Sequence, residues 1–155
     1  MKKKIVLITA ALATAAAVSW TITHEETPMK VTFLSSPGAE KMNLPFSEAV
    51  RVGDLLYLSG QLGNTSGSRT IVPGGIGPET RQTMENIKAA LERHGSSLDR
   101  VVKCTVFLAD IKEWEAMNEV YRTFFGKTPP ARSTIGTSGL ALGARVEIEC
   151  IATAG

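Results

Sequence analysis

The chain has 155 residues, 43% hydrophobic and 21% charged, which is ordinary for one globular domain that buries a single core. Its formal net charge is +2, but residues 1–19 hold three lysines and no acid, so the rest of the chain carries −1. Without a basic cluster, the composition argues against a nucleic-acid-binding protein.

The N-terminus has the layout of a secretory signal peptide. Lys2, Lys3 and Lys4 precede an uncharged, alanine-rich run, 5–18, which is too short to span a membrane and ends among small residues. We expect a signal peptide over 1–19, cleaved near 17–19, and an exported protein, periplasmic or secreted, that is free of the membrane after cleavage. An uncleaved anchor or a short buried helix is the alternative.

Residues 20–44 are polar and irregular and are predicted to form an N-terminal arm in front of a domain that spans 45–155. The domain begins with a β-hairpin over 48–58. Two apolar, β-favouring runs flank Gly53-Asp54, and a glycine supplies the positive φ that a two-residue hairpin turn requires.

A glycine-rich loop is predicted over 63–78, and residues 71–72 within it could form a short strand. The loop leads into a helix over 78–94. A strand rich in β-branched residues is predicted over 100–108. Asp110-x-x-Glu113 resembles a capping box that opens a second helix, and Gly126 ends it.

Residues 128–143 read as a connection, and 145–152 as the last strand. The element order, hairpin, helix, strand, helix, strand, predicts an α+β fold with two helices on one face of a small mixed sheet.

Cys104 and Cys150 are the only cysteines, and both share the alternation phase of their apolar neighbours. A disulfide is geometrically possible if their strands are adjacent, whereas two buried free thiols are the alternative that we favour. Neither cysteine has the spacing of a zinc site, and His24 and His94 are far apart in sequence. We therefore expect no metal and no cofactor.

Three segments could carry chemistry. Arg132 follows Pro129-Pro130-Ala131, a stiff lead-in to a guanidinium that can bind a carboxylate through two parallel hydrogen bonds. Glu147 and Glu149 point to one side of the last strand and could position water or take up a proton. Ser59-Gly60 exposes backbone at a strand end. Taken separately, each segment also has a non-functional interpretation: a surface arginine, an exposed acidic strand face and an ordinary strand end.

Six segments, in order along residues 40–153, resemble the RidA (YjgF/YER057c/UK114) family. The pair Pro-x-Arg-Ser and Ser-Gly-Gln is fairly specific for that family. The segments are Pro45-Phe-Ser-Glu-Ala-Val, Val52-Gly-Asp-Leu-Leu-Tyr-Leu-Ser-Gly-Gln61, Asn86-Ile-Lys-Ala-Ala-Leu, Val102-Lys-Cys-Thr-Val-Phe-Leu, Pro130-Ala-Arg-Ser133 and Val146-Glu-Ile-Glu-Cys-Ile-Ala152.

The resemblance implies a chorismate-mutase-like fold, a homotrimer with a ligand cleft at each subunit interface, and hydrolysis of 2-imino acids and enamines to 2-oxo acids and ammonia without a cofactor. It implies that Arg132 holds the substrate carboxylate and that Glu147, rather than Glu149, orients the attacking water. Ser59, Gly60 and Asn118 match residues that line the cleft.

Three positions depart from the archetypal family pattern: Phe46 replaces a tyrosine, Glu48 a glutamine, and Thr134 a cysteine. Phe46 and Thr134 are retained as substrate-binding positions. The alternative function is a non-catalytic trimer of the same fold that binds small carboxylates or acts as a chaperone. The family has also been linked to ribonuclease activity, which a net charge of −1 does not favour.

Overall fold

The computed structural model describes residues 28–65 and 67–155, so the predicted signal peptide lies outside the described chain. Within it, three α-helices and seven strands alternate with short 3-10 turns. Their bounds are β1 Val31–Leu34, α1 Pro37–Lys41, β2 Ala49–Val52, β3 Leu55–Leu58, β4 Gln61–Leu62, α2 Ile76–Arg93, β5 Val101–Leu108, α3 Trp114–Tyr121, β6 Ala131–Gly136 and β7 Val146–Thr153.

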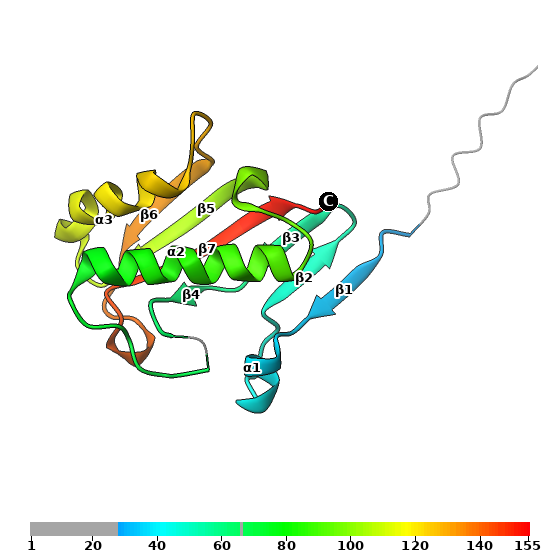
Figure 1. Ribbon diagram of the computed structural model, residues 1–155, viewed down its shortest axis with the longest axis horizontal. Coiled ribbons are helices and arrows are strands. Elements are labelled where there is room, and N and C mark those ends of the chain that lie inside the picture. Colours follow the sequence, from blue (N-terminus) through cyan, green and yellow to red (C-terminus); the bar gives the residue numbers. More distant parts are fainter. Residues whose placement is uncertain (1–27, 66) are drawn as a thin grey trace, which may run out of the picture.

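The strands form one mixed sheet in the order β1-β2-β3-β7-β5-β6, and β4 pairs with β7 beyond the end of β3. Among the strands of the described residues, only the β5–β6 pair is parallel, and α3 lies in the crossover between these two strands. Helices α2 and α3 lie on the same face of the sheet (Figure 1). The predicted α+β fold with two helices on one face is confirmed.

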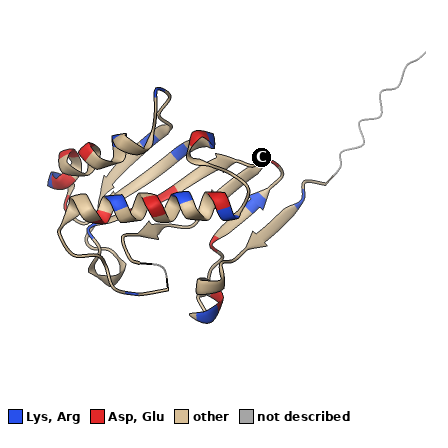
Figure 2. Ribbon diagram, viewed as in Figure 1, with Lys and Arg blue, Asp and Glu red and all other residues tan. Residues whose placement is uncertain are grey.

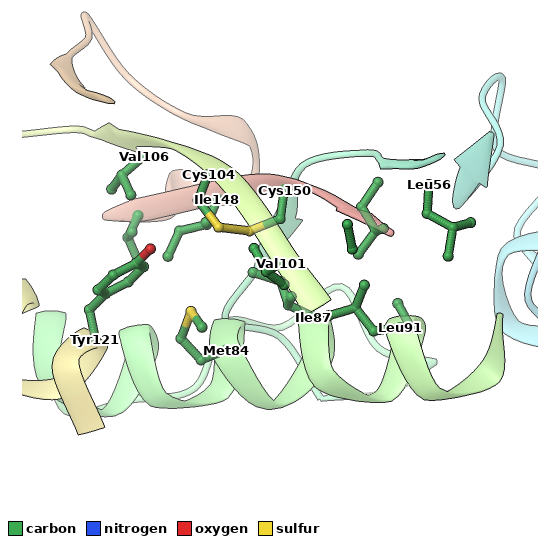
Figure 3. Packing of buried hydrophobic residues seen from close by; sticks show 14 of the residues in the cluster. Leu56, Met84, Ile87, Leu91, Val101, Cys104, Val106, Tyr121, Ile148 and Cys150 are labelled. Atoms are coloured by element: carbon green, nitrogen blue, oxygen red, sulfur yellow. A yellow bond between two sulfur atoms is a disulfide. The ribbon is translucent and has the colours of Figure 1, made fainter. Parts of the chain in front are cut away.

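The core fills the space between the sheet and α2. Met84, Ile87 and Leu91 of α2 pack against inward-facing residues of β5 and β7, among them Val106 and Ile148 (Figure 3). All five side chains are fully buried. The i, i+3, i+7 spacing on α2 and the alternation on the strands put these side chains on facing surfaces, and their burial is the main stabilising contribution.

The two cysteines are joined by a disulfide. Cys104 of β5 and Cys150 of β7 are direct cross-strand partners, and their sulfur atoms are bonded on the side of the sheet that faces α2 (Figure 3). Free thiols, which the sequence led us to favour, were therefore the wrong choice. The alternation phase was read correctly, but the strand adjacency that makes the bond possible is a property of the tertiary fold.

Two segments contain regular structure that the sequence did not predict. Residues 31–34 of the supposedly irregular arm form β1 at the edge of the sheet, where Val31 pairs with Val52. Residues 131–136 of the supposed connection form β6, because all six pair with β5, the next strand of the sheet. Both are edge strands, with one paired side each, and their sequences lack a clear apolar alternation.

The helices begin differently from the prediction. Helix α2 starts at Ile76, two residues before the predicted proline, and ends as predicted before Gly95, which has a positive φ of 79°. The expected capping box is half formed: the Asp110 side chain accepts from the amide of Lys112 instead. Glu113 pairs with Arg145 rather than reaching back to the cap.

The described helices include none that is long and apolar enough to cross a membrane. Basic and acidic residues are interspersed along α2 (Figure 2). Such a helix surface carries no extended field of one sign.

Candidate active site

Arg132 lies on the helix-covered face of the sheet, as the second residue of β6. It pairs with Cys104, whose side chain is fully buried under α2. The guanidinium carbon of Arg132 lies 4.6 Å from the centroid of the Tyr121 ring of α3, which is a cation–π distance. Within residues 28–65 and 67–155, no carboxylate lies within ion-pair distance of this arginine. The contact with Tyr121 therefore fixes the cation while leaving its charge available to an external anion.

A cavity of about 400 Å³ lies beside this arginine. Burial raises the pKa of Tyr121 to about 12, and the neighbouring Arg132 charge only partly opposes this effect, so the ring remains a neutral phenol. Asn118, one turn earlier on α3 and 9% exposed, shares the cavity. The other lining residues come from the end of α3 and its connection to β6: Arg122, Phe125, Gly126, Pro129 and Pro130.

Glu147 lies on the opposite face of the sheet. Its neighbours on β7, Val146 and Ile148, are fully buried toward α2, so alternation directs Glu147 to the helix-free face, as the sequence predicted. The pKa of Glu147 lies above the usual carboxyl value. The larger cause is burial of the side chain, and the smaller one is the nearby charge of Glu149. A carboxylate with a raised pKa is a better base than an ordinary surface glutamate.

Gly60 is in direct contact with the Glu147 carboxylate. A β-carbon at position 60 would lie 2.0 Å from Oε1 of Glu147, so the carboxylate can keep this position only while residue 60 has no side chain. The register explains this proximity. Between the pairs Tyr57–Ile151 and Gln61–Ile148, three residues of one strand lie opposite two of β7. The extra residue is a bulge-like irregularity, of the kind that often occurs beside functional sites.

The remaining predicted residues divide between the two faces. The hydroxyl of Ser59 donates to the carbonyl oxygen of Ser47 at 2.7 Å, so it anchors the hairpin next to Gly60. Phe46 is 55% exposed and lines a second cavity together with Gly60. Thr134 lies two residues beyond Arg132 on the same strand face, opposite Val106, and does not line the Arg132 cavity.

The structure thus forms two half-sites. The first, the arginine half-site, consists of Arg132, Tyr121 and Asn118 on the helix-covered face. The second, the carboxylate half-site, consists of Glu147 and Gly60 on the helix-free face, at the bulge. Because the sheet separates the two faces, one copy of the chain does not bring Arg132 and Glu147 to a common ligand.

One supporting residue was missed by the sequence reasoning. Glu79, on α2, is 2% exposed, and its Oε1 accepts from the backbone amides of Arg145 at 2.6 Å and Val146 at 3.2 Å. These hydrogen bonds fix the start of β7 one residue before Glu147. In the sequence, Glu79 is only an acid in the first turn of a helix, where it would ordinarily be solvated. No local signal reveals its partners.

A mixed sheet covered on one face, with a cation on one side and a glycine-flanked acid on the other, defines an α+β protein with a composite polar site. The chain belongs to the Endoribonuclease L-PSP family, which matches residues 38–154. The family includes the RidA (YjgF/UK114) proteins, so the resemblance found in the sequence is confirmed.

The relatives are similar over most of their length. The 2-iminobutanoate/2-iminopropanoate deaminase of Capra hircus is 44% identical over 111 residues, which cover 72% of this chain and 81% of the relative. The protein of the same name from Dermatophagoides farinae is 41% identical over 118 residues, covering 76% and 92%.

Solved structures agree with the fold. The crystal structure of yeast YEO7 has a TM-score of 0.76 and 38% identity, and the match covers 81% of this chain and all of that one. RidA from the Antarctic bacterium Psychrobacter has a TM-score of 0.68 and 37% identity, covering 71% and 89%.

Proposed function

We propose that the protein hydrolyses 2-imino acids and their enamine tautomers to 2-oxo acids and ammonia. Two kinds of observation support this. Relatives about as long as this domain are named 2-iminobutanoate/2-iminopropanoate deaminase. The observation that carries the proposal is Arg132, a cation held on an aromatic ring with no carboxylate partner in the described chain, because it suits the carboxylate that every 2-imino acid carries.

In the proposed reaction, Arg132 binds the substrate carboxylate and Glu147 holds a water molecule against the iminium carbon. The water oxygen bonds to that carbon while one water proton passes to the Glu147 carboxylate. The proton then goes to the nitrogen and the carbon–nitrogen bond breaks, so that ammonia leaves, and the hydroxyl group passes its remaining proton to the Glu147 carboxylate as the carbonyl forms. An iminium carbon is already electrophilic, so positioning the water supplies most of the catalysis needed.

The opposite faces of the two half-sites imply that the site is completed by a second copy of the chain, and we propose a homotrimer. The helix-free face carries large exposed apolar side chains, with Phe33 73%, Tyr57 42% and Ile135 49% exposed. Such a surface favours association. In a closed ring, each interface can join the arginine half-site of one copy to the carboxylate half-site of the next.

We also propose that residues 1–19 direct export to the periplasm or the medium. The Cys104–Cys150 disulfide supports this proposal, because such bonds persist in oxidising compartments and are rare in the cytosol. N-terminal sequencing of protein recovered from the producing cells tests it; a mature chain that still begins at Met1 contradicts cleavage.

The activity is tested with 2-iminopropanoate, generated in place by an amino-acid oxidase, on the mature protein. Arg132→Ala is expected to lower kcat/KM at least about a hundredfold, because the carboxylate anchor is lost. Arg81→Ala is the matched control, since Arg81 also lies over an aromatic ring, Phe124, but lines neither cavity. An Arg132→Ala rate equal to wild type contradicts the proposal. Carboxylate binding without turnover by wild type would instead favour the non-catalytic alternative.

A further inference from the structure

The second cavity, which the proposed reaction does not use, has a volume of about 600 Å³. It lies between the α1–β2 segment, α2, the loop after β4 and the turn before β7. We call it the β4 cavity, because both residues of β4 line it. Its apolar lining includes Met42, Leu44, Phe46, Leu62, Ala89 and Leu142.

The β4 cavity borders the carboxylate half-site. Gly60 lines the cavity and contacts the Glu147 carboxylate, since its missing β-carbon would lie 2.0 Å from Oε1. Leu62 also lines the cavity, and it is the cross-strand partner of Glu147. A molecule whose reacting carbon sits at Glu147 can therefore extend past Gly60 and Leu62 into the cavity.

The one acidic residue at the cavity is already paired with basic side chains. Glu48 is its one acidic lining residue, and Oε2 of Glu48 lies 2.7 Å from Nη1 of Arg93 and 2.8 Å from Nε2 of His94. The acid is therefore already paired. Arg69 also lines the cavity, but it is exposed on the loop, where solvent screens its charge. A neutral, apolar group can therefore enter the cavity without leaving a buried charge unpaired.

Two apolar side chains that line the cavity are exposed to solvent. Phe46 is 55% exposed and Leu142 is 51% exposed. Leu142 also adopts a left-handed backbone conformation, with φ 60° and ψ 14°, which is unfavourable for a residue with a β-carbon. Such strain is concentrated at binding sites. Here it keeps a leucine side chain on the cavity wall, where an apolar ligand would cover it.

We propose that the β4 cavity receives the side chain of the substrate, and that the preferred 2-imino acids carry a branched aliphatic or an aromatic side chain. This inference rests on the proposed function. The methyl group of 2-iminopropanoate is too small to cover the cavity wall. A leucine- or phenylalanine-derived imine instead buries apolar surface of its own side chain and of the cavity wall. Burial of a few additional carbon atoms favours the larger substrate by about tenfold or more.

The test compares kcat/KM for imines generated from alanine, leucine and phenylalanine. Wild type is expected to favour the leucine- and phenylalanine-derived imines over the alanine-derived imine at least about tenfold. Ala89→Trp, which fills the cavity from the exposed surface of α2, is expected to reduce that ratio about tenfold. Lys88→Trp is the matched control, because Lys88 is exposed and does not line the cavity.

Leu142→Gly gives a second, independent measurement. Glycine accepts the left-handed backbone, so the variant removes only the apolar side chain, and the ratio is expected to fall severalfold. Turnover of the alanine-derived imine without a preference for larger substrates overturns this inference alone, as does an Ala89→Trp ratio equal to that of Lys88→Trp. No turnover of any imine overturns the proposed function and this inference together.

Discussion

The arginine half-site and the carboxylate half-site obtain their properties in different ways. Arg132 lies on a regular strand, and contact with the Tyr121 ring holds its guanidinium. Glu147 lies where the sheet is irregular, and its properties depend on burial and on a neighbouring residue without a side chain. A cation can thus be positioned by ordinary packing, whereas a carboxylate with a raised pKa requires a place where the backbone leaves room and water is partly excluded.

The largest expected effect tests whether the two half-sites belong to different copies. Arg132→Ala and Glu147→Gln are each expected to lower kcat/KM at least about a hundredfold. If each site takes Arg132 from one copy and Glu147 from the next, mixed assemblies of the two variants contain intact sites. Random mixing in equal amounts restores about a quarter of wild-type activity.

The measurement uses the two variants refolded together, with mixed composition verified by native mass spectrometry. Each variant refolded alone is the control. Mixed assemblies that remain inactive would contradict a site shared between copies.

Gly60→Ala is expected to have an intermediate effect. The added β-carbon would overlap the Glu147 carboxylate, which is the end of a flexible side chain and can turn aside, so the free energy of unfolding is expected to change little, whereas displacement of the acid slows imine hydrolysis. Gly77→Ala is the matched control. Gly77 lies in α2, and its added β-carbon would meet only Val120 of α3, at an ordinary contact distance of 3.9 Å. That substitution is expected to stabilise the helix by up to about 1 kcal/mol. The imine assay and denaturant unfolding measure both variants; an unchanged rate of imine hydrolysis for Gly60→Ala contradicts the proposed role of this glycine.

The smallest expected effect concerns pH. Glu147 acts as a carboxylate, so kcat/KM falls as the pH drops through its raised pKa. Glu149→Gln removes the charge that contributes to this raised pKa, and the acid limb of the profile is therefore expected to move to lower pH. An acid limb that stays in place, or moves to higher pH, contradicts the assignment.

The free energy of unfolding also depends on the ionisation of Glu147, and the direction of that dependence follows from its raised pKa. The pKa of Glu147 is higher in the folded than in the unfolded chain, so ionisation of this carboxyl destabilises the fold as the pH rises through the folded value. Glu147→Gln is therefore expected to be more stable than wild type at neutral pH and to lose that advantage below the ordinary carboxyl pKa, about 4.3. Unfolding at the two pH values checks this.

The sequence predicted the elements whose patterns are local. The hairpin around Gly53, the apolar stripe of α2 and the alternation of β7 were all recognisable, because each depends on residues a few positions apart. Strand β6 was missed because its pairing with β5 comes from a crossover rather than from its own composition.

The site was predicted in part for the same reason. Alternation along one strand was enough to orient Glu147. The contact between Gly60 and Glu147, the Tyr121 ring beside Arg132 and the hydrogen bonds of Glu79 join residues far apart in the chain. No pattern within one segment encodes them. Family resemblance selected the residues, but only the sheet showed that Arg132 and Glu147 face opposite sides.

The Cys104–Cys150 disulfide closes a covalent ring. Its two cysteines are 46 positions apart in sequence, and the segment between them carries α3 and β6. Lys127 lies inside that ring in the exposed connection that precedes Arg132. A protease that cuts the chain once at this lysine leaves two pieces that remain covalently joined, so the strand with Arg132 cannot diffuse away from the sheet. The bond thus makes the chain tolerant of a nick beside its proposed binding site, which would matter most in the protease-containing surroundings that the proposed export implies.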